Sequence, residues 1–149
     1  MADPRLVVLT GGGEGADGTF RVSHEAASVP LARRALVREL DRCGAPGDAV
    51  DEVALVASEL LGNAVRHAAP LGPGSLLLRW RVLPGAVEVE VVDGGGGPVR
   101  VTTAGPEATS GRGMHLVSEL ADAWGTTDDG HGRRAVWASV GTARTPVAV

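Results

Sequence analysis

The feature that most constrains the fold is a Pro-Gly turn at 84–85, between two runs of strand-like residues. A hairpin centred on this turn places Arg81 opposite Glu88 and Arg79 opposite Glu90. Opposite charges directly across two antiparallel strands stabilise the pair by roughly 0.2–1 kcal/mol each. Because the turn and the charge pattern agree, the sequence predicts one antiparallel hairpin with one register.

Further strands and three helices are predicted around this hairpin. Apolar periodicity identifies each element, and proline or glycine punctuates the ends. The strands are expected at 19–24, 75–83, 86–93, 124–127 and 133–140, and the helices at 30–43, 48–68 and 112–121. Hairpin-linked strands with helices grouped apart predict an α+β two-layer sandwich, with a mixed, mostly antiparallel sheet and helices on one face. We expect a flexible arm over 1–18, one domain over 19–141 and a tail over 142–149.

Composition excludes several classes of function. All 14 basic residues are arginine, so the lysine of a Walker loop, a Schiff base or an ordinary protein-kinase strand is absent. Cys43 is the only cysteine, which rules out an intrachain disulfide and a cysteine zinc cluster. The net charge of −4 argues against direct nucleic-acid binding. Since no apolar stretch is long enough for a signal peptide or a membrane span, we expect a cytoplasmic protein without membrane contact.

Two surface patterns allow more than one interpretation. Residues 13–18 match G-x-G-x-x-G, but strand-like alternation follows where a dinucleotide-binding loop needs a helix, so we interpret the match as chance. Arg34, Arg38 and Arg42 recur every four residues along the predicted helix 30–43. They form either a solvated face or a docking surface for an acidic partner.

Two polar residues interrupt the apolar helix predicted over 48–68. Glu59 and Asn63 are four residues apart and therefore share one face. A carboxamide oxygen can complete a Mg²⁺ shell, and a carboxylate can take a proton from a hydroxyl; an ordinary polar helix surface is the alternative. The mid-helix Gly62 indicates that something approaches the backbone closely there.

Two glycine-rich segments follow. Asp93 ends a predicted strand before four glycines at 94–97, where a flat ligand could approach the main chain and Asp93 could accept a hydrogen bond from an exocyclic amine. Residues 110–114 lie where the last helix starts, and free N–H groups there, with Arg112, suit an anion. A plain turn and a hinge are the respective alternatives.

These three segments resemble the sequence boxes of the GHKL superfamily, the histidine-kinase-like ATPases. The run ELLGNAVRH at 59–67 resembles the N box, DGGGGP at 93–98 the first glycine box, and GRGMHLV at 111–117 the second. The resemblance extends from about Phe20 to Val140. Within the superfamily, the chain looks like the small anti-sigma-factor serine kinases of bacteria, and especially like their actinobacterial relatives.

The resemblance implies a Bergerat-type fold that holds ATP and Mg²⁺ beneath a lid over 98–110. It would make Asn63 the Mg²⁺ ligand and Glu59 the general base. Asp93 would bind the adenine amine, with Gly95 and Gly97 shaping the pocket. Further nucleotide-binding residues would be Arg66, His67, Gly111, Arg112, Gly113 and Met114.

The resemblance also implies a function and its partners. We expect an anti-sigma factor with Mg-ATP-dependent serine/threonine kinase activity toward an anti-anti-sigma (STAS-type) protein, and a sigma factor as a second partner. Two alternatives are an ATP-binding module that only sequesters its partner, and a nucleotide-free structural domain. Nothing in the sequence resembles a phosphoacceptor dimerisation domain, so we expect a stand-alone regulator, and a homodimer by analogy with the related kinases.

Overall fold

One six-stranded sheet organises residues 3–10, 16–96 and 112–142, which a computed structural model describes. Its strands are β1 Leu6–Thr10, β2 Asp17–Ser23, β3 Ser75–Leu83, β4 Ala86–Asp93, β5 Ala123–Asp128 and β6 Arg134–Gly141. They lie in the order β1-β2-β3-β4-β6-β5. Every pairing between these described strands is antiparallel, so the sheet has no parallel pair in this part of the chain.

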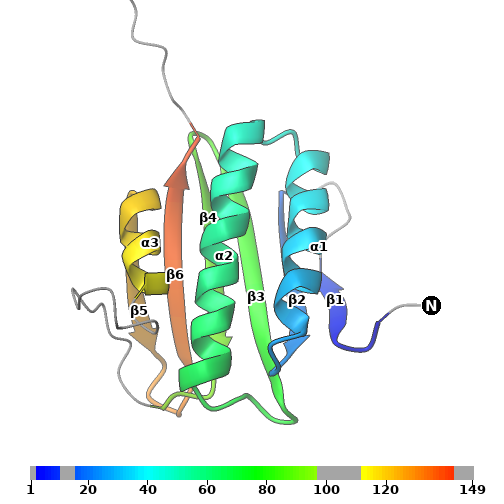
Figure 1. Cartoon of the computed structure of the whole chain (residues 1–149), viewed down its shortest axis with the longest axis vertical. Helices are drawn as coiled ribbons and strands as arrows, with labels where there is room; N and C mark the ends of the chain where they lie inside the picture. The colour runs from blue at the N-terminus through cyan, green and yellow to red at the C-terminus, as the bar shows by residue number, and fades with distance from the viewer. Residues whose placement is uncertain (1–2, 11–15, 97–111, 143–149) are drawn as a thin grey trace, which may run out of the picture.

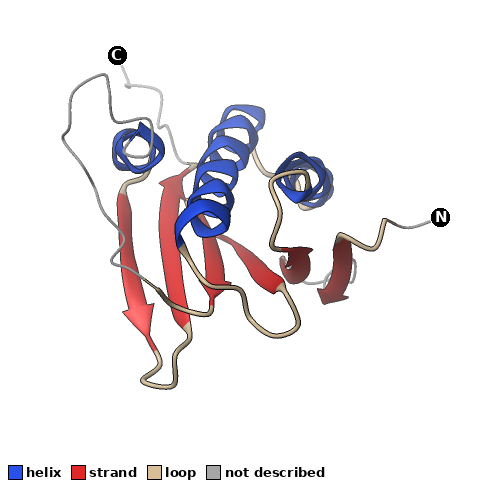
Figure 2. Ribbon diagram, turned by 60° about the horizontal axis from the view of Figure 1, so that its bottom comes forward, coloured by secondary structure: helices blue, strands red, loops and turns tan. Residues whose placement is uncertain are grey.

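Three helices cover one face of this sheet (Figure 1). They are α1 Ser28–Arg42, α2 Gly47–His67 and α3 Arg112–Leu120. Figure 2 shows all three on the same side of the strands, which confirms the predicted α+β two-layer architecture. Among the described helices, none has both the length and the apolar character needed to cross a membrane.

The hairpin at 84–85 has the register that its charges predict. β3 and β4 pair with Arg81 opposite Glu88 and Arg79 opposite Glu90. The nearest nitrogen and oxygen atoms of each pair are 3.1 Å apart. These ion pairs lie on the face of the sheet opposite the helices, where solvent screening keeps their contribution small.

The hydrophobic core lies between the helices and the sheet. The largest fully buried side chains include Phe20, Leu36, Leu40, Leu60, Leu61, Leu76, Leu78 and Met114. At one end of the core the rings of Phe20 and Trp80 pack together, with centroids 4.4 Å apart. Gly18 makes room for this packing, because a Cβ at that position would overlap the Trp80 indole. The glycine at this position therefore serves the packing of the core.

The N-terminal segment differs from its prediction as a flexible arm. Leu6–Thr10 forms β1 and pairs with β2, and Leu6 packs against the core. Val8 and Leu9 are 54% and 46% exposed, so the run lacks the inside-outside alternation that identifies a strand. β2 begins at Asp17, within the G-x-G-x-x-G match at 13–18, so a strand and not a helix continues from the match, as expected. Residues 11–15 and 143–149 lie outside the described part of the chain.

Candidate functional site

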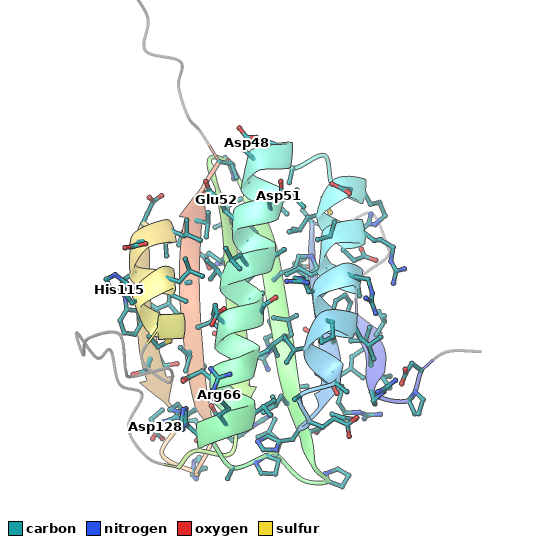
Figure 3. The ribbon with its side chains drawn as sticks, in the orientation of Figure 1. Asp48, Asp51, Glu52, Arg66, His115 and Asp128 are labelled. Atoms are coloured by element: carbon teal, nitrogen blue, oxygen red, sulfur yellow. The ribbon has the colours of Figure 1, made fainter. Side chains whose placement is uncertain are left out.

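Three of the predicted site residues lie along one flank of α2. Glu59, Asn63 and Arg66 occupy positions i, i+4 and i+7, which a helix of 3.6 residues per turn brings to one side. Asn63 is 8% exposed, Glu59 is half-buried, and Arg66 is exposed near the C-terminal end of the helix (Figure 3). Within the described residues, the side chains of Glu59 and Asn63 have no hydrogen-bond or ion-pair partner, so both are available to a ligand.

Gly62 separates these two residues in the sequence and explains the position of Arg66. A Cβ on Gly62 would lie 3.1 Å from Nη1 of Arg66. The guanidinium group thus folds back one turn and rests on the bare backbone at Gly62. The mid-helix glycine predicted that some group approaches the backbone closely. In the structure, the Arg66 side chain of the same helix makes such an approach.

Main-chain hydrogen bonds join the segment after α2 to the glycines after β4. The Gly94 N–H donates to the Ala69 carbonyl, and the Ala69 N–H donates to the Gly95 carbonyl, each at 2.7 Å. A Cβ on Gly94 would collide with the Pro70 carbonyl oxygen. Gly95 and Gly96 have φ angles of +84° and +129°, which side chains disfavour. These glycines therefore hold the end of β4 against the end of α2.

Asp93, the last residue of β4, is fully buried at this junction. Its Oδ1 accepts a hydrogen bond of 2.7 Å from the Gly95 N–H, and its Oδ2 lies 3.4 Å from Nη2 of Arg134 in β6. Burial raises the pKa of the Asp93 carboxyl, and the Gly95 N–H and the Arg134 charge oppose that rise only in part. The structure thus places a buried acceptor beside the half-buried main chain of Gly94 and Gly95.

Two residues of this junction were not predicted from the sequence. Nε2 of His24, just after β2, lies 2.9 Å from the Ala68 carbonyl and 3.1 Å from the Ala64 carbonyl. The Ala64 carbonyl also accepts a hydrogen bond from the Ala68 N–H, so His24 adds a second partner there and gives the carbonyl of Ala68, just past the last residue of α2, a partner as well. Arg134 is the other, and no local pattern distinguished it from its neighbour Arg133. Only the pairing of β4 with β6, which places Asp93 opposite Arg134, identifies it.

Some of the remaining predicted site residues lie outside the described part of the chain, and the others lie in α3 or at the end of α2. Gly97, Gly111 and the lid predicted over 98–110 lie outside the described residues. α3 begins at Arg112, as predicted, and continues through Gly113. The Met114 side chain is fully buried in the core, so only its main chain remains for a phosphate. His67 is exposed at the last position of α2.

The described residues contain no group of three or more His, Cys, Asp or Glu side chains placed to hold a metal ion. A Mg²⁺ ion bound with a nucleotide does not require one, because it keeps several waters and takes most other ligands from phosphates. One amide oxygen from Asn63 fits that mode of binding. Asn63 and Glu59, which have no partner among the described residues, are therefore compatible with Mg-ATP, as is the glycine main chain at 94–96.

A family model matches most of the chain. Residues 22–139 match a family model described as the histidine kinase-like ATPase domain. Among solved structures, the chain is similar to the histidine kinase domain of a blue-light activated histidine kinase from Erythrobacter litoralis, with 23% identity and a TM-score of 0.48. That match covers 83% of this chain and 63% of the other, so the chain spans less than two thirds of that structure. A search of curated protein sequences gave no match.

Proposed function

The chain belongs to the histidine kinase-like ATPase family, and we propose that it is an ATP-dependent regulator that phosphorylates a serine or threonine of a protein partner. The observation that carries the proposal is the pair Glu59 and Asn63 on one flank of α2, two side chains without a partner among the residues that the structure describes. A protein that only held nucleotide would use Asn63 but would have no need of a free carboxylate one turn away. Glu59 therefore favours phosphotransfer over binding alone.

Different site residues would bind different parts of the nucleotide. The Asp93 carboxylate would accept a hydrogen bond from the adenine amine, since its buried oxygens face neighbours that leave acceptor capacity free. Asn63 would hold Mg²⁺, which supplies neutralisation of the charge on the phosphate oxygens. Arg66 lies on the same flank and presents a guanidinium group that suits the phosphates.

Glu59 would act as the general base of the transfer. Its carboxylate takes the proton of the acceptor hydroxyl, and that oxygen attacks the γ-phosphorus of ATP. The bond between the γ-phosphorus and the bridging oxygen breaks, and ADP leaves with the electron pair. The products are ADP, a phosphorylated side chain and a protonated Glu59, which returns its proton to solvent.

The resemblance to anti-sigma-factor kinases supplies the proposed partners. The substrate would be an anti-anti-sigma (STAS-type) protein in the cytoplasm, and a sigma factor would be the protein that the chain sequesters, with the chain acting as a homodimer. Phosphorylation adds a charge of about −1.5 to −2 at an interface, enough to separate the kinase from its substrate. Sequestration without phosphotransfer is the alternative function, and it needs nucleotide binding but not Glu59.

Labelled ATP, Mg²⁺ and a purified STAS-type protein test the proposal with two variants. We expect the wild-type chain to label the protein, and Glu59→Gln to reduce the rate at least ~100-fold while ATP affinity is kept. Asn63→Ala should instead lose the Mg²⁺-dependent rise in melting temperature that ATP gives the wild type. If Glu59→Gln labels the partner at the wild-type rate, phosphotransfer by this base is wrong. If ATP leaves the melting temperature of the wild type unchanged, the nucleotide-free alternative holds.

A further inference from the structure

A groove of about 570 Å³ lies between α1 and α2, apart from the candidate nucleotide site. α1 contributes Arg33, Arg34 and Arg38, all of them exposed and hereafter called the groove arginines. Between them lie Val37 of α1 and Leu55 of α2. Leu55 is 37% exposed, which is unusual for a large apolar side chain of this protein. The groove therefore combines apolar surface with concentrated positive charge.

The charge of the groove is not compensated by the described part of the chain. None of the groove arginines has an ion pair with a described residue. Arg42 continues the same stripe along α1 but is bound to Glu39 at 2.9 Å. The groove contains one acidic residue, Asp51, so its three positive charges face a single negative one.

This local charge contrasts with the protein as a whole, whose net charge is −4. Arg34 and Arg38 lie one helical turn apart, and like charges at that spacing destabilise a helix. An arrangement that is unfavourable for the isolated helix, and that sits beside an exposed leucine, fits a surface completed by a partner. Such a partner would have to supply negative charge together with an apolar side chain.

The surroundings of the groove favour a short acidic segment over an extended polyanion. Asp48, Asp51 and Glu52 gather at the N-terminal end of α2 (Figure 3), and Asp41 is exposed near the end of α1. A nucleic acid or an anionic lipid surface extends well beyond the groove and would bring its charges against these carboxylates. A protein segment can confine its carboxylates to the groove arginines.

We propose that this groove binds an acidic helical segment of a protein partner. Arg34 and Arg38 are separated by about 6 Å along α1, and carboxylates at i and i+4 of a partner helix have the same spacing. Each guanidinium group can bind a carboxylate through two parallel hydrogen bonds. An apolar side chain on the same face of the partner would cover Leu55 and Val37. The proposal needs only the groove and does not depend on phosphotransfer.

Fluorescence anisotropy with a defined peptide tests the proposal on the full chain. The probe is a labelled helical peptide with glutamates at i and i+4 and a leucine between them, and its control carries glutamine in place of each glutamate. We expect Arg34→Gln with Arg38→Gln to weaken binding of the acidic peptide at least tenfold, and high salt to weaken it in the wild type. Arg21→Gln with Arg133→Gln removes the same charge elsewhere and should leave the affinity unchanged. Leu55→Ala should weaken binding without changing its dependence on salt.

Several outcomes would overturn the proposal. Equal binding of the glutamine peptide, equal affinity of the groove variant, or no binding of the acidic peptide at all would each exclude an acidic segment. Tighter binding of a DNA duplex, or of phosphatidylserine vesicles, through the same arginines would assign the groove to another class of partner. Because the groove arginines lie outside the candidate nucleotide site, the rise in melting temperature with Mg-ATP should persist in the groove variant. This measurement separates failure of the groove proposal from failure of the nucleotide site.

Discussion

Replacing Asp93 with asparagine separates the proposed nucleotide-binding role of this residue from its structural one. Asparagine has nearly the same shape, and its Oδ1 can still accept the 2.7 Å hydrogen bond from the Gly95 N–H. Its Nδ2 would face Nη2 of Arg134, now 3.4 Å from a carboxylate oxygen, and two donors would meet there. In the proposed site, the same Nδ2 would also face the amino group of adenine. An N–H donor would thus replace the carboxylate acceptor at both contacts, with Arg134 and with adenine.

The structure predicts a small effect of Asp93→Asn on stability. Burial raises the pKa of Asp93 despite the Gly95 N–H and Arg134, so folding disfavours the charged carboxylate relative to the neutral one. The neutral asparagine side chain avoids the penalty for burying a charge. This gain offsets the loss of the 3.4 Å contact between the carboxylate and Arg134. We therefore expect the free energy of unfolding at neutral pH to change by less than about 1 kcal/mol, the net worth of one typical hydrogen bond.

The pH dependence has a definite sign. The favourable contribution of protonated Asp93 is complete below its unfolded-state pKa, near 3.8, and is lost as the pH rises through the raised folded-state pKa. The asparagine variant has no such loss. As the pH is raised from 4 to 7, chemical denaturation should therefore show the free energy of unfolding of the variant increasing relative to that of the wild type.

The expected effect on nucleotide binding is much larger. Losing the acceptor for a buried amine costs about 1–3 kcal/mol, or roughly 5- to 150-fold in the dissociation constant for Mg-ATP. Isothermal titration calorimetry measures this constant, and Glu59→Gln is the control that should bind ATP as the wild type does. A folded Asp93→Asn variant with wild-type affinity for ATP would show that Asp93 does not bind the adenine amine.

Three further experiments test the packing and the register around the site. Gly94→Ala should lower the free energy of unfolding by about 1–3 kcal/mol, because its Cβ would collide with the Pro70 carbonyl; an unchanged urea midpoint would contradict this close approach. A double-mutant cycle on Arg81 and Glu88, with each residue changed to alanine, should give a coupling of about 0.2–1 kcal/mol that decreases in salt. A coupling that does not depend on salt would argue against an ion pair. His24→Ala should cost about 1 kcal/mol and speed amide exchange in the last turn of α2, and unaltered exchange there would show that the ring does not support this helix end.

Local sequence patterns predicted most of the fold and part of the site. The turn at 84–85 and the charges on either side of it lie within a few residues of one another, so they could fix the register of β3 and β4 before any tertiary contact was known. Glu59 and Asn63 were recognised for the same reason, since helical spacing alone puts them on one face of α2. β1 was missed because an edge strand with two exposed apolar residues carries no alternation.

The sequence by itself thus determined the helices, the hairpin, and the polar and glycine-rich segments that can serve a nucleotide. Only the tertiary structure decided what surrounds Asp93 and the end of α2. Arg134 reaches Asp93 from 41 residues away, and His24 reaches the carbonyl of Ala68 from 44 residues away. Such contacts depend on which strands become neighbours, and β4 lies beside β6 instead of β5, the strand that follows it in the sequence. Periodicity describes one element at a time, so it cannot show which groups of distant elements share the same buried space.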